Sequence, residues 1–539
     1  MKMAQRLPAI PSTDLMGSTA PPWLVQAERK RALQRAAIDS FLAEYPPLPA
    51  AERHATESIP DIDRVEELLS SISTRAVSAV DVVVAYTHSL TEVLFDDALA
   101  HAKELDRHLA ATGKPIGPLH GLPVTLKDQF DVKGYDSTIG YVAKAFRPAS
   151  EDAVVVALLR ELGAIIIAKT NLPQSIMWCE TENPLWGLTT NPRNPAFTPG
   201  GSTGGESALL AEHGSIIGWG TDIGGSIRIP SHMLGLYGLK PSSGRLPYQN
   251  VTVSTDGQEH VPSVIGPLAR SLCSLRFVTK AVVDAAPWQY DPKVVPLPWR
   301  ADIEAEIQSR PLVIGLLVDD GVVRVHPPIE RVVRETARKL EEAGHEVIPW
   351  DYSGHQECIE IMDQFYTADG GEDIRREVLA GGEPFIPHVE ALVNRGKPIS
   401  VYEYWQLNKL KHEQQKRYLD KWNAVRSPSG RKVDVLLTPV MPHSAVPHRG
   451  CRWVGYTKVW NFLDYSAVVL PGGAVDKNMD AKADTSYQPR NELDKWNWSL
   501  YDPESMDGMP VGLQIVGRKL EEEKVLGAAK VVESILQRK

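Results

Sequence analysis

Short β-branched runs alternate with helical segments along this chain, and that alternation restricts its fold more than any other feature. AIIIAKT (Ala164–Thr170) is a continuous apolar run of the kind found in buried strands. LPVTLKD (Leu122–Asp128) alternates apolar and polar residues, which also predicts a strand. Between them, Asp152 is expected to cap a helix that reaches Leu162 and stops at Gly163.

The same alternation continues to the last residues of the sequence. The expected strands are Ser215–Asp222, Leu312–Val318, His345–Asp351, Val433–Val440 and Pro510–Gly517. The expected helices are Asp61–Val83, Leu90–Ala111, Ile329–Ala343, Val401–Val425 and Leu520–Gln537. This order favours an α/β fold: one large, twisted, mixed sheet covered on both faces by helices, over residues 61–539. Residues 1–60 are rich in Pro and Ala and are expected to form a peripheral helical arm.

Charge and composition exclude several classes of function. The net charge of −10 argues against nucleic-acid binding, which needs clustered Lys and Arg. Four cysteines lie far apart without a CxxC, so neither a disulfide framework nor a zinc site is expected. No secretory segment or membrane span is indicated, and we expect a reducing, cytoplasmic location. The aromatic residues of Val401–Val425 are interpreted as packing residues of the core or of a homodimer.

The most unusual stretch is PGGSTGGESALLAEHGSIIGWGTDIGGSIRIP (Pro199–Pro230), with nine glycines and four serines in 32 residues. It lacks the GxxxxGK[ST] of a phosphate loop, and GWGTDIGG has the wrong spacing for a dinucleotide fingerprint. Gly200–Gly204 matches GxSxG literally, but the central Ser202 does not follow a strand, as a nucleophile elbow requires. Close backbone packing is another use of such glycines.

An anion-binding turn at a helix start is the interpretation with the most chemical content. The strand ending at Asp222 leads into Ile223, Gly224, Gly225 and Ser226, and SIRIPSHM then begins a short helix. Free N–H groups at such a turn can stabilise an oxyanion, with Ser226 as the nucleophile.

A serine nucleophile needs a base, and the sequence leaves its identity open. His213 lies inside the segment but is followed by Gly214, as at the end of a helix. A histidine distant in the chain is not excluded. A buried lysine is the other option. Lys127 ends an expected strand, and a fall of its pKa by about three units corresponds to roughly 4 kcal/mol, which burial can supply.

Two blocks of this sequence resemble the amidase signature family. GGSTGGESALLAEHGSIIGWGTDIGGSIRIP is similar to that family's serine and glycine signature, and GPLHGLPVTLKD to the block with its catalytic lysine. The resemblance extends from about Asp61 to the end and is closest to fungal acetamidase-type amidases, with fatty acid amide hydrolase more distant. It implies hydrolysis of a small-molecule carboxamide through an acyl-enzyme, without cofactor or metal.

The resemblance also implies the residues of the site. The implied nucleophile, cis-peptide serine and base are Ser226, Ser202 and Lys127. The implied oxyanion and substrate contacts are Ile176, Ser202, Ile223, Gly224, Gly225 and Ser226. The implied supporting residues are Thr203, Asp222 and Arg228.

This sequence departs from the family pattern at Thr203, where the signature usually has a second serine, and in the short link Ala85–Glu92. Two alternative functions remain at this stage. One is a transamidating role, in which the chain resembles the amidase-like component of the aminoacyl-tRNA amidotransferase. The other is a catalytically silent binding protein. Cys179, beside Trp178, is interpreted as a packed side chain and not as the nucleophile of a thiol hydrolase.

Overall fold

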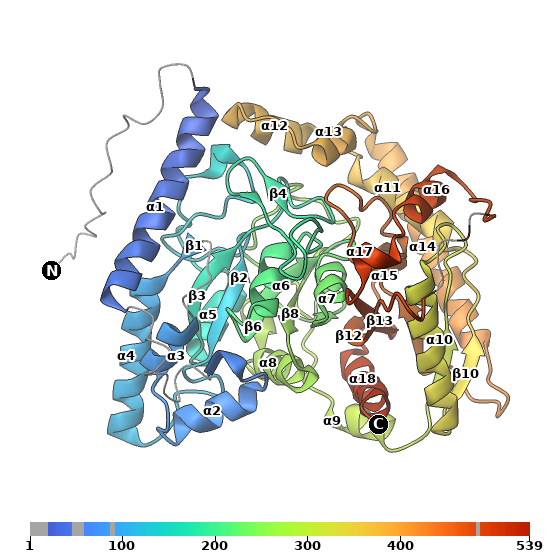
Figure 1. Ribbon diagram of the computed structural model, residues 1–539, viewed down its shortest axis with the longest axis horizontal. Helices are drawn as coiled ribbons and strands as arrows, with labels where there is room; N and C mark the ends of the chain where they lie inside the picture. Colours follow the sequence, from blue (N-terminus) through green and yellow to red (C-terminus); the bar gives the residue numbers. More distant parts are fainter. Residues whose placement is uncertain (1–19, 46–58, 87–91, 481–483, 485, 539) are drawn as a thin grey trace.

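A computed structural model describes residues 20–45, 59–86, 92–480, 484 and 486–538 (Figure 1). The strands of its main sheet are β1 Glu92–Val93, β2 Pro123–Lys127, β3 Ile165–Thr170, β6 Ile217–Asp222, β7 Tyr237–Lys240, β8 Val264–Ala269, β9 Val313–Leu316, β10 Glu346–Pro349, β11 Val435–Pro439, β12 Ala467–Ala474 and β13 Pro510–Val516. A separate hairpin pairs β4 Glu182–Asn183 with β5 Gly187–Leu188.

Within the described residues the main sheet has eleven strands in the order β1-β3-β2-β6-β8-β7-β12-β13-β11-β9-β10. β3, β2 and β6 run parallel to one another, as do β11, β9 and β10. The strands between these groups pair antiparallel. The predicted fold class, a large mixed α/β sheet, is therefore confirmed.

Helices cover the sheet and its margins (Figure 1). α6 and α7 pack against each other and on the sheet at β6, β7 and β12, while α8 packs at β8, α10 at β11 and β12, and α18 at β12. The helices are α1 Pro22–Glu44, α2 Val65–Ser73, α3 Ala79–Tyr86, α4 Phe95–Thr112, α5 Val154–Glu161, α6 Gly204–Ala211, α7 Arg228–Leu234, α8 Leu272–Asp284, α9 Ala301–Gln308, α10 Pro327–Glu342, α11 His355–Tyr366, α12 Glu372–Gly381, α13 Pro387–Val393, α14 Val401–Ala424, α15 Gly455–Phe462, α16 Glu492–Ser499, α17 Pro503–Met506 and α18 Glu522–Leu536.

The helix expected over Asp61–Val83 is wrong as a single element. The structure has α2 and α3 instead, separated by a turn in which Arg75 has φ of 59°. The left-handed conformation at this residue cannot be part of an α-helix. The expected cap of α5 is also wrong, because the Asp152 carboxylate accepts from the Lys133 N–H and from Arg160 while Ala153 occupies the cap position.

Three strands in the middle of the sheet, β7, β8 and β12, were not expected from the sequence. β8 contains Gly266-Pro267 and β12 contains Pro471-Gly472-Gly473, residues that usually mark turns. The register of β12 against β13 shifts between Pro471 and Gly473, so the proline lies at an irregularity.

The N-terminal helix α1 packs along one edge of the molecule (Figure 1). Lys30 pairs with Asp136 at 2.7 Å, and Arg31 donates to the Leu185 and Pro184 carbonyls. The boundary between arm and domain at residue 60 stays a prediction. Residues 87–91 of the short link are outside the described part of the chain. Within the described part, no helix combines the length and apolar character needed to cross a bilayer.

Candidate active site

Two neighbouring strands bring Lys127 and Asp222 to the same edge of the sheet. β2 and β6 are parallel, with Leu126 opposite Trp219, so their carboxyl ends coincide. Lys127 is the last residue of β2, and Asp222 is the last residue of β6. In open α/β sheets this edge is where ligands bind.

The two Gly-Gly-Ser segments meet above this edge. Ser202 precedes α6 and follows a cis peptide bond from Gly201, while Ser226 lies just before α7. The Thr203 N–H donates to the Ser226 carbonyl at 3.2 Å, so one backbone hydrogen bond joins the segments. A cavity of about 1010 Å³ opens here, and its lining includes Ser202, Ser226, Ile176, Thr221 and Ile223.

Lys127 is fully buried beneath this cavity. Its Nζ lies 2.6 Å from Ser202 Oγ and 2.9 Å from Thr221 Oγ1. Burial lowers the pKa of Lys127 to about 7, against the weaker opposing effect of nearby negative charges, chiefly Asp222. An amine with this pKa is neutral in about half of the molecules near pH 7, and its neutral form can accept a proton.

Thr221 and Gln129 fix how the lysine presents its amine. The Thr221 hydroxyl donates to Gln129 Oε1 at 2.7 Å. The Gln129 side chain is oriented in turn by Nε2, which donates to the Thr252 carbonyl at 3.1 Å. Because the single hydroxyl hydrogen of Thr221 is committed to Gln129, Thr221 can only accept from Lys127.

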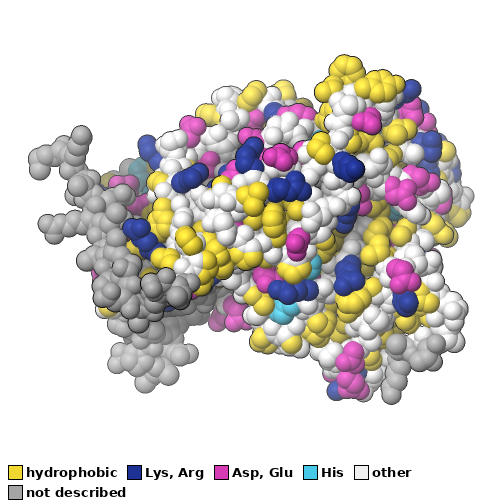
Figure 2. Space-filling view, turned by 90° about the horizontal axis from the view of Figure 1, so that it is seen from above, with side chains coloured by type: hydrophobic (Ala, Val, Ile, Leu, Met, Phe, Trp, Pro, Cys, Tyr) yellow, Lys and Arg dark blue, Asp and Glu magenta, His cyan; other side chains and the backbone are white. Residues whose placement is uncertain are grey.

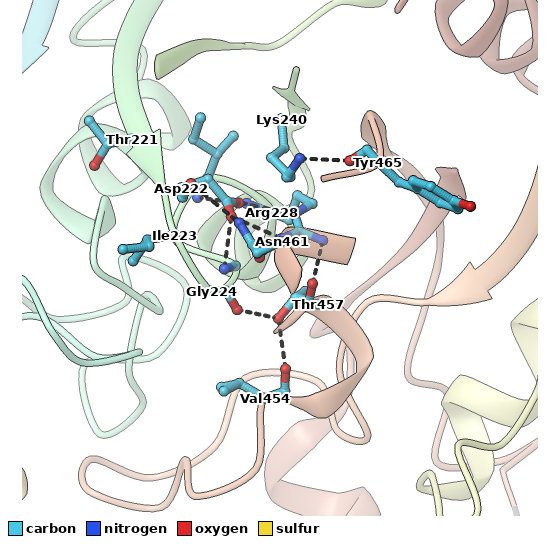
Figure 3. A network of polar contacts seen from close by, with 12 residues as sticks. Thr221, Asp222, Ile223, Gly224, Arg228, Lys240, Val454, Thr457, Asn461 and Tyr465 are labelled. Atoms are coloured by element: carbon cyan, nitrogen blue, oxygen red, sulfur yellow. Dashed lines mark hydrogen bonds and ion pairs between the residues drawn. The ribbon is translucent and has the colours of Figure 1, made fainter. Parts of the chain in front are cut away.

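A buried ion pair lies behind the turn that carries Ser226 (Figure 3). Arg228 Nη2 and Nε lie 2.9 and 3.0 Å from the two carboxylate oxygens of Asp222, and both side chains are fully buried. Asn461 Nδ2 donates to Asp222 Oδ1 at 2.9 Å. Arg228 also donates to the Thr457 carbonyl and to Gln514 Oε1. Burial alone would raise the pKa of Asp222, but Arg228, Lys240 and the Asn461 hydrogen bond together outweigh burial and hold that pKa at about 2.

Two carbonyls of the turn accept hydrogen bonds from hydroxyl groups on two helices. Tyr366, at the end of α11, donates its hydroxyl to the Ile223 carbonyl at 2.6 Å. Thr457, on α15, donates to the Gly224 carbonyl at 2.7 Å (Figure 3). In a trans peptide unit the N–H points away from the C=O. The Tyr366 hydrogen bond therefore sets the direction of the Gly224 N–H, and the Thr457 hydrogen bond sets that of the Gly225 N–H.

The four N–H groups of the turn are not equivalent. The Gly225 N–H donates to Asp222 Oδ1 at 2.9 Å, so Asp222 already engages one of the four groups. Among the described residues, no hydrogen-bond acceptor is found for the N–H of Ile223, Gly224 or Ser226. These three groups can therefore receive an oxygen from a ligand.

Ile176, which lines the cavity, and the buried Ser175 before it have an unusual backbone conformation. Their φ angles are 60° and 68°, and positive φ is a genuine outlier for a β-branched residue such as Ile176. The Ser175 N–H donates to the Ile139 carbonyl at 3.0 Å, and the Ile176 N–H donates to the Pro173 carbonyl at 2.9 Å. Such outliers persist only where surrounding contacts fix them, and they cluster at ligand-binding sites.

Comparison with known proteins identifies the family. The family profile described as "Amidase" matches residues 73–526. The chain belongs to the amidase family. It is 58% identical over 482 residues to "Amidase 1" of Gibberella moniliformis, covering 88% of this chain and 92% of the relative. It is 41% identical over 485 residues to an acetamidase of Emericella nidulans, covering 87% and 88%.

A solved structure, "Fatty acid amide hydrolase", superposes with a TM-score of 0.85 at 31% identity, covering 98% of this chain and 93% of that one. The expected resemblance to fungal acetamidases and to fatty acid amide hydrolase is confirmed. The enzyme is therefore an amide hydrolase of the amidase signature family. The named relatives are amidases and acetamidases, so the transamidating alternative gains no support.

His213, which lies inside the signature segment, and His120, which precedes Lys127 in the sequence, are the histidines nearest the motifs, and both lie elsewhere in the amidase. His120 Nδ1 accepts the Ile116 N–H, and His213 Nδ1 lies 3.1 Å from the Pro60 carbonyl. Neither lines the cavity of Ser202 and Ser226. The upper face of the enzyme carries acidic and basic side chains interspersed, without a uniformly basic area (Figure 2). Among the described residues, no cluster of three or more His, Cys, Asp or Glu side chains is arranged to hold a metal ion.

Sequence reasoning missed Glu206, a buried carboxyl group near the site of this amidase. Thr203, which the resemblance implied as a supporting residue, is buried, and its hydroxyl faces the Thr221 carbonyl at 3.4 Å. Glu206 is buried and accepts from Thr125 at 2.6 Å and Thr170 at 2.7 Å, and burial raises its pKa to about 8. A charged Glu206 raises the pKa of Lys127, and this effect is weakened because burial disfavours the Glu206 carboxylate. Glu206 sits inside the quoted signature, but its partners are visible only in three dimensions.

Proposed function

We propose that this amidase hydrolyses small carboxamides with Ser226 as nucleophile, Ser202 as proton relay and Lys127 as base. The observation that carries the proposal is the 2.6 Å contact between Lys127 Nζ and Ser202 Oγ, made by a fully buried amine whose pKa lies at about 7. Ser202 and Ser226 share the cavity above that contact.

The hydrogen bonds of Lys127 support the direction of proton transfer. A neutral amine has two N–H donors and one lone pair. Thr221 can only accept, because its own hydrogen goes to Gln129, so one N–H of Lys127 points at Thr221. This leaves the lone pair free to take the hydroxyl proton of Ser202.

The reaction then follows from the order of the three groups. Lys127 accepts the Ser202 proton as Ser202 Oγ accepts the Ser226 proton, and Ser226 Oγ attacks the amide carbonyl. The oxyanion lies toward the unengaged N–H groups of Ile223, Gly224 and Ser226. The proton returns through Ser202 to the leaving nitrogen, which departs as amine or ammonia. Water then hydrolyses the acyl-enzyme by the same relay.

A common-intermediate experiment tests the acyl-enzyme. Acetamide and N-methylacetamide would give the same acetyl-enzyme, so in a fixed concentration of hydroxylamine both should yield the same ratio of acetohydroxamate to acetate. The control is the Ser226→Ala protein, which should form neither product. Ratios that differ between the two amides, or turnover without hydroxamate, would refute the covalent intermediate.

A further inference from the structure

Two cysteines that are far apart in the sequence meet beside the active-site wall. Cys179 Sγ and Cys451 Sγ lie 2.8 Å apart, although 272 residues separate them in the chain. Both side chains are buried, and both residues lie outside helices and strands. They are free thiols in this structure. The sequence pattern offered no reason to pair them, because neither belongs to a CxxC.

The backbone around the pair is already held in place. One Glu180 carboxylate oxygen accepts from the Cys451 N–H at 2.9 Å, and the other accepts from the Arg449 N–H at 2.6 Å. Closing a disulfide requires the sulfurs to approach by only about 0.8 Å, to the usual 2.05 Å. A side-chain adjustment of this size leaves the Glu180 hydrogen bonds intact.

The pair also lies next to the Gly201–Ser202 segment of the candidate active site. A Cβ on Gly201 would lie 2.7 Å from the Glu180 nitrogen and 2.8 Å from the Cys179 carbonyl carbon, so this peptide packs directly on the Gly201–Ser202 segment. Cys179 also follows closely on Ile176 and Met177, which line the cavity. On the other side, the Val446 carbonyl accepts from the Thr198 N–H, which precedes the same segment.

We propose that Cys179 and Cys451 are a modification site: hydrogen peroxide converts them to an intramolecular disulfide that joins the cavity wall at 176–180 to the loop at 446–451. In the first step Cys179 sulfur attacks the peroxide oxygen, giving a sulfenic acid and water. In the second step Cys451 sulfur attacks Cys179 sulfur and displaces a second water. The two thiols lose two electrons and the peroxide gains them.

The order of the two steps follows from burial. Cys179 keeps 6% of its surface exposed, whereas Cys451 is fully buried. Burial raises the pKa of the Cys451 thiol well above its usual range, so Cys451 is the poorer first nucleophile. Cys179 is therefore oxidised first, and Cys451 resolves it.

The other two cysteines serve as internal controls. Cys358 is buried on α11, and burial raises its thiol pKa to about 12. Cys273 lies on α8 with its sulfur 3.4 Å from Ser271 Oγ. Neither has a cysteine partner among the described residues, so neither should form an intramolecular disulfide.

The test is oxidation of the folded, full-length protein with hydrogen peroxide, followed by quenching, alkylation in denaturant and peptide mapping without reduction. We expect a single cross-linked species that joins the peptides of Cys179 and Cys451, with Cys273 and Cys358 alkylated. The Cys358→Ser protein should give the same cross-link, and the Cys451→Ser protein should not. Wild-type protein measured reduced and oxidised needs no variant, and its unfolding midpoint should rise by roughly 2–5 °C on oxidation.

Alkylation of both Cys179 and Cys451 after oxidation would overturn the proposal, as would cross-links that involve Cys273 or Cys358. A cross-linked protein with an unchanged midpoint would show that the bond does not stabilise the wall. None of these measurements depends on amide hydrolysis, so the result stands apart from the proposed catalytic relay.

Discussion

Lys127 Nζ lies 2.6 Å from Ser202 Oγ at the end of a buried strand, where desolvation brings the lysine pKa to about 7. The same amine lies within hydrogen-bonding distance of Thr221 Oγ1. Thr221 cannot donate to Lys127, because its hydroxyl hydrogen is donated to Gln129. The sheet thus places an oriented amine, readily neutralised near pH 7, at the edge where two serines line the same cavity. In the proposed relay, Lys127 takes the place that histidine has in most serine hydrolases.

Replacement of Lys127 by arginine tests whether a base is needed. Wild-type kcat/KM should rise with pH through about 7, because the neutral form of Lys127 is the reactive one. In Lys127→Arg this rise of kcat/KM with pH should disappear, and the rate should fall by about 10²–10⁴-fold, since guanidinium does not accept a proton. The exposed Lys133→Arg is the control and should match the wild type. Near-normal turnover of Lys127→Arg would reduce the lysine to a structural cation.

Removal of the buried amine should make the protein more stable. A pKa lowered from 10.5 to about 7 corresponds to roughly 5 kcal/mol of unfavourable burial for the charged lysine. Lys127→Met loses two hydrogen bonds worth about 1 kcal/mol each, so a net gain of about 1–3 kcal/mol is expected at pH 7.

That gain should shrink between pH 7 and pH 10.5, because in this window the unfolded wild type binds a proton that the folded wild type does not. Wild-type stability therefore rises with pH through the window. Urea unfolding at several pH values measures both effects. A Lys127→Met protein less stable than the wild type at pH 7 would contradict the account.

Loss of the Tyr366 hydroxyl should impair catalysis without impairing binding. Tyr366→Phe leaves the Ile223 carbonyl without its 2.6 Å donor, so the Gly224 N–H is less well directed at an oxyanion. We expect kcat to fall by about tenfold, less than the loss of an oxyanion donor itself, with KM almost unchanged. Tyr402→Phe, at an exposed tyrosine of α14, is the matched control. A higher KM at constant kcat would assign Tyr366 to substrate binding instead.

Disruption of the buried ion pair should destabilise the whole fold. Arg228→Met leaves Asp222 buried without its partner, and the expected loss is about 3–5 kcal/mol in the free energy of unfolding. Arg338→Met removes an exposed pair with Glu342 on α10 and should cost less than about 0.5 kcal/mol. Equal effects of the two substitutions would mean that the Asp222–Arg228 pair does not organise the turn.

The parts of the fold predicted from sequence are those with strong local patterns. Ala164–Thr170 is a β-branched run and became β3, and α10 and α14 follow the expected helices within two residues at each end. β8 and β12 were missed because glycine and proline inside them resemble turns, whereas their place in the middle of the sheet is fixed by neighbours distant in sequence.

The site shows the same division. Lys127, Asp222 and the two Gly-Gly-Ser segments were found from strand ends, glycine spacing and family resemblance. The residues that hold them in place were not predicted, because these contacts join distant parts of the sequence. Tyr366 bonds to Ile223 across 143 residues, and Gln514 bonds to Arg228 across 286. The burial of the aromatic residues of α14 was also not evident from the sequence: Tyr418 and Trp422 are buried, while Tyr402 and Trp405 are exposed. The homodimer stays a prediction.

Covalent labelling tests the proposed nucleophile most directly. A fluorophosphonate should form one adduct per chain, and peptide mass spectrometry should place it on Ser226. Ser226→Ala should abolish labelling and lower the amidase activity by more than about 10²-fold, while Ser309→Ala, at an exposed serine after α9, should change neither. An adduct on Ser202 or Cys179, or a Ser226→Ala protein that keeps more than about one per cent of wild-type activity, would contradict the Ser226–Ser202–Lys127 relay.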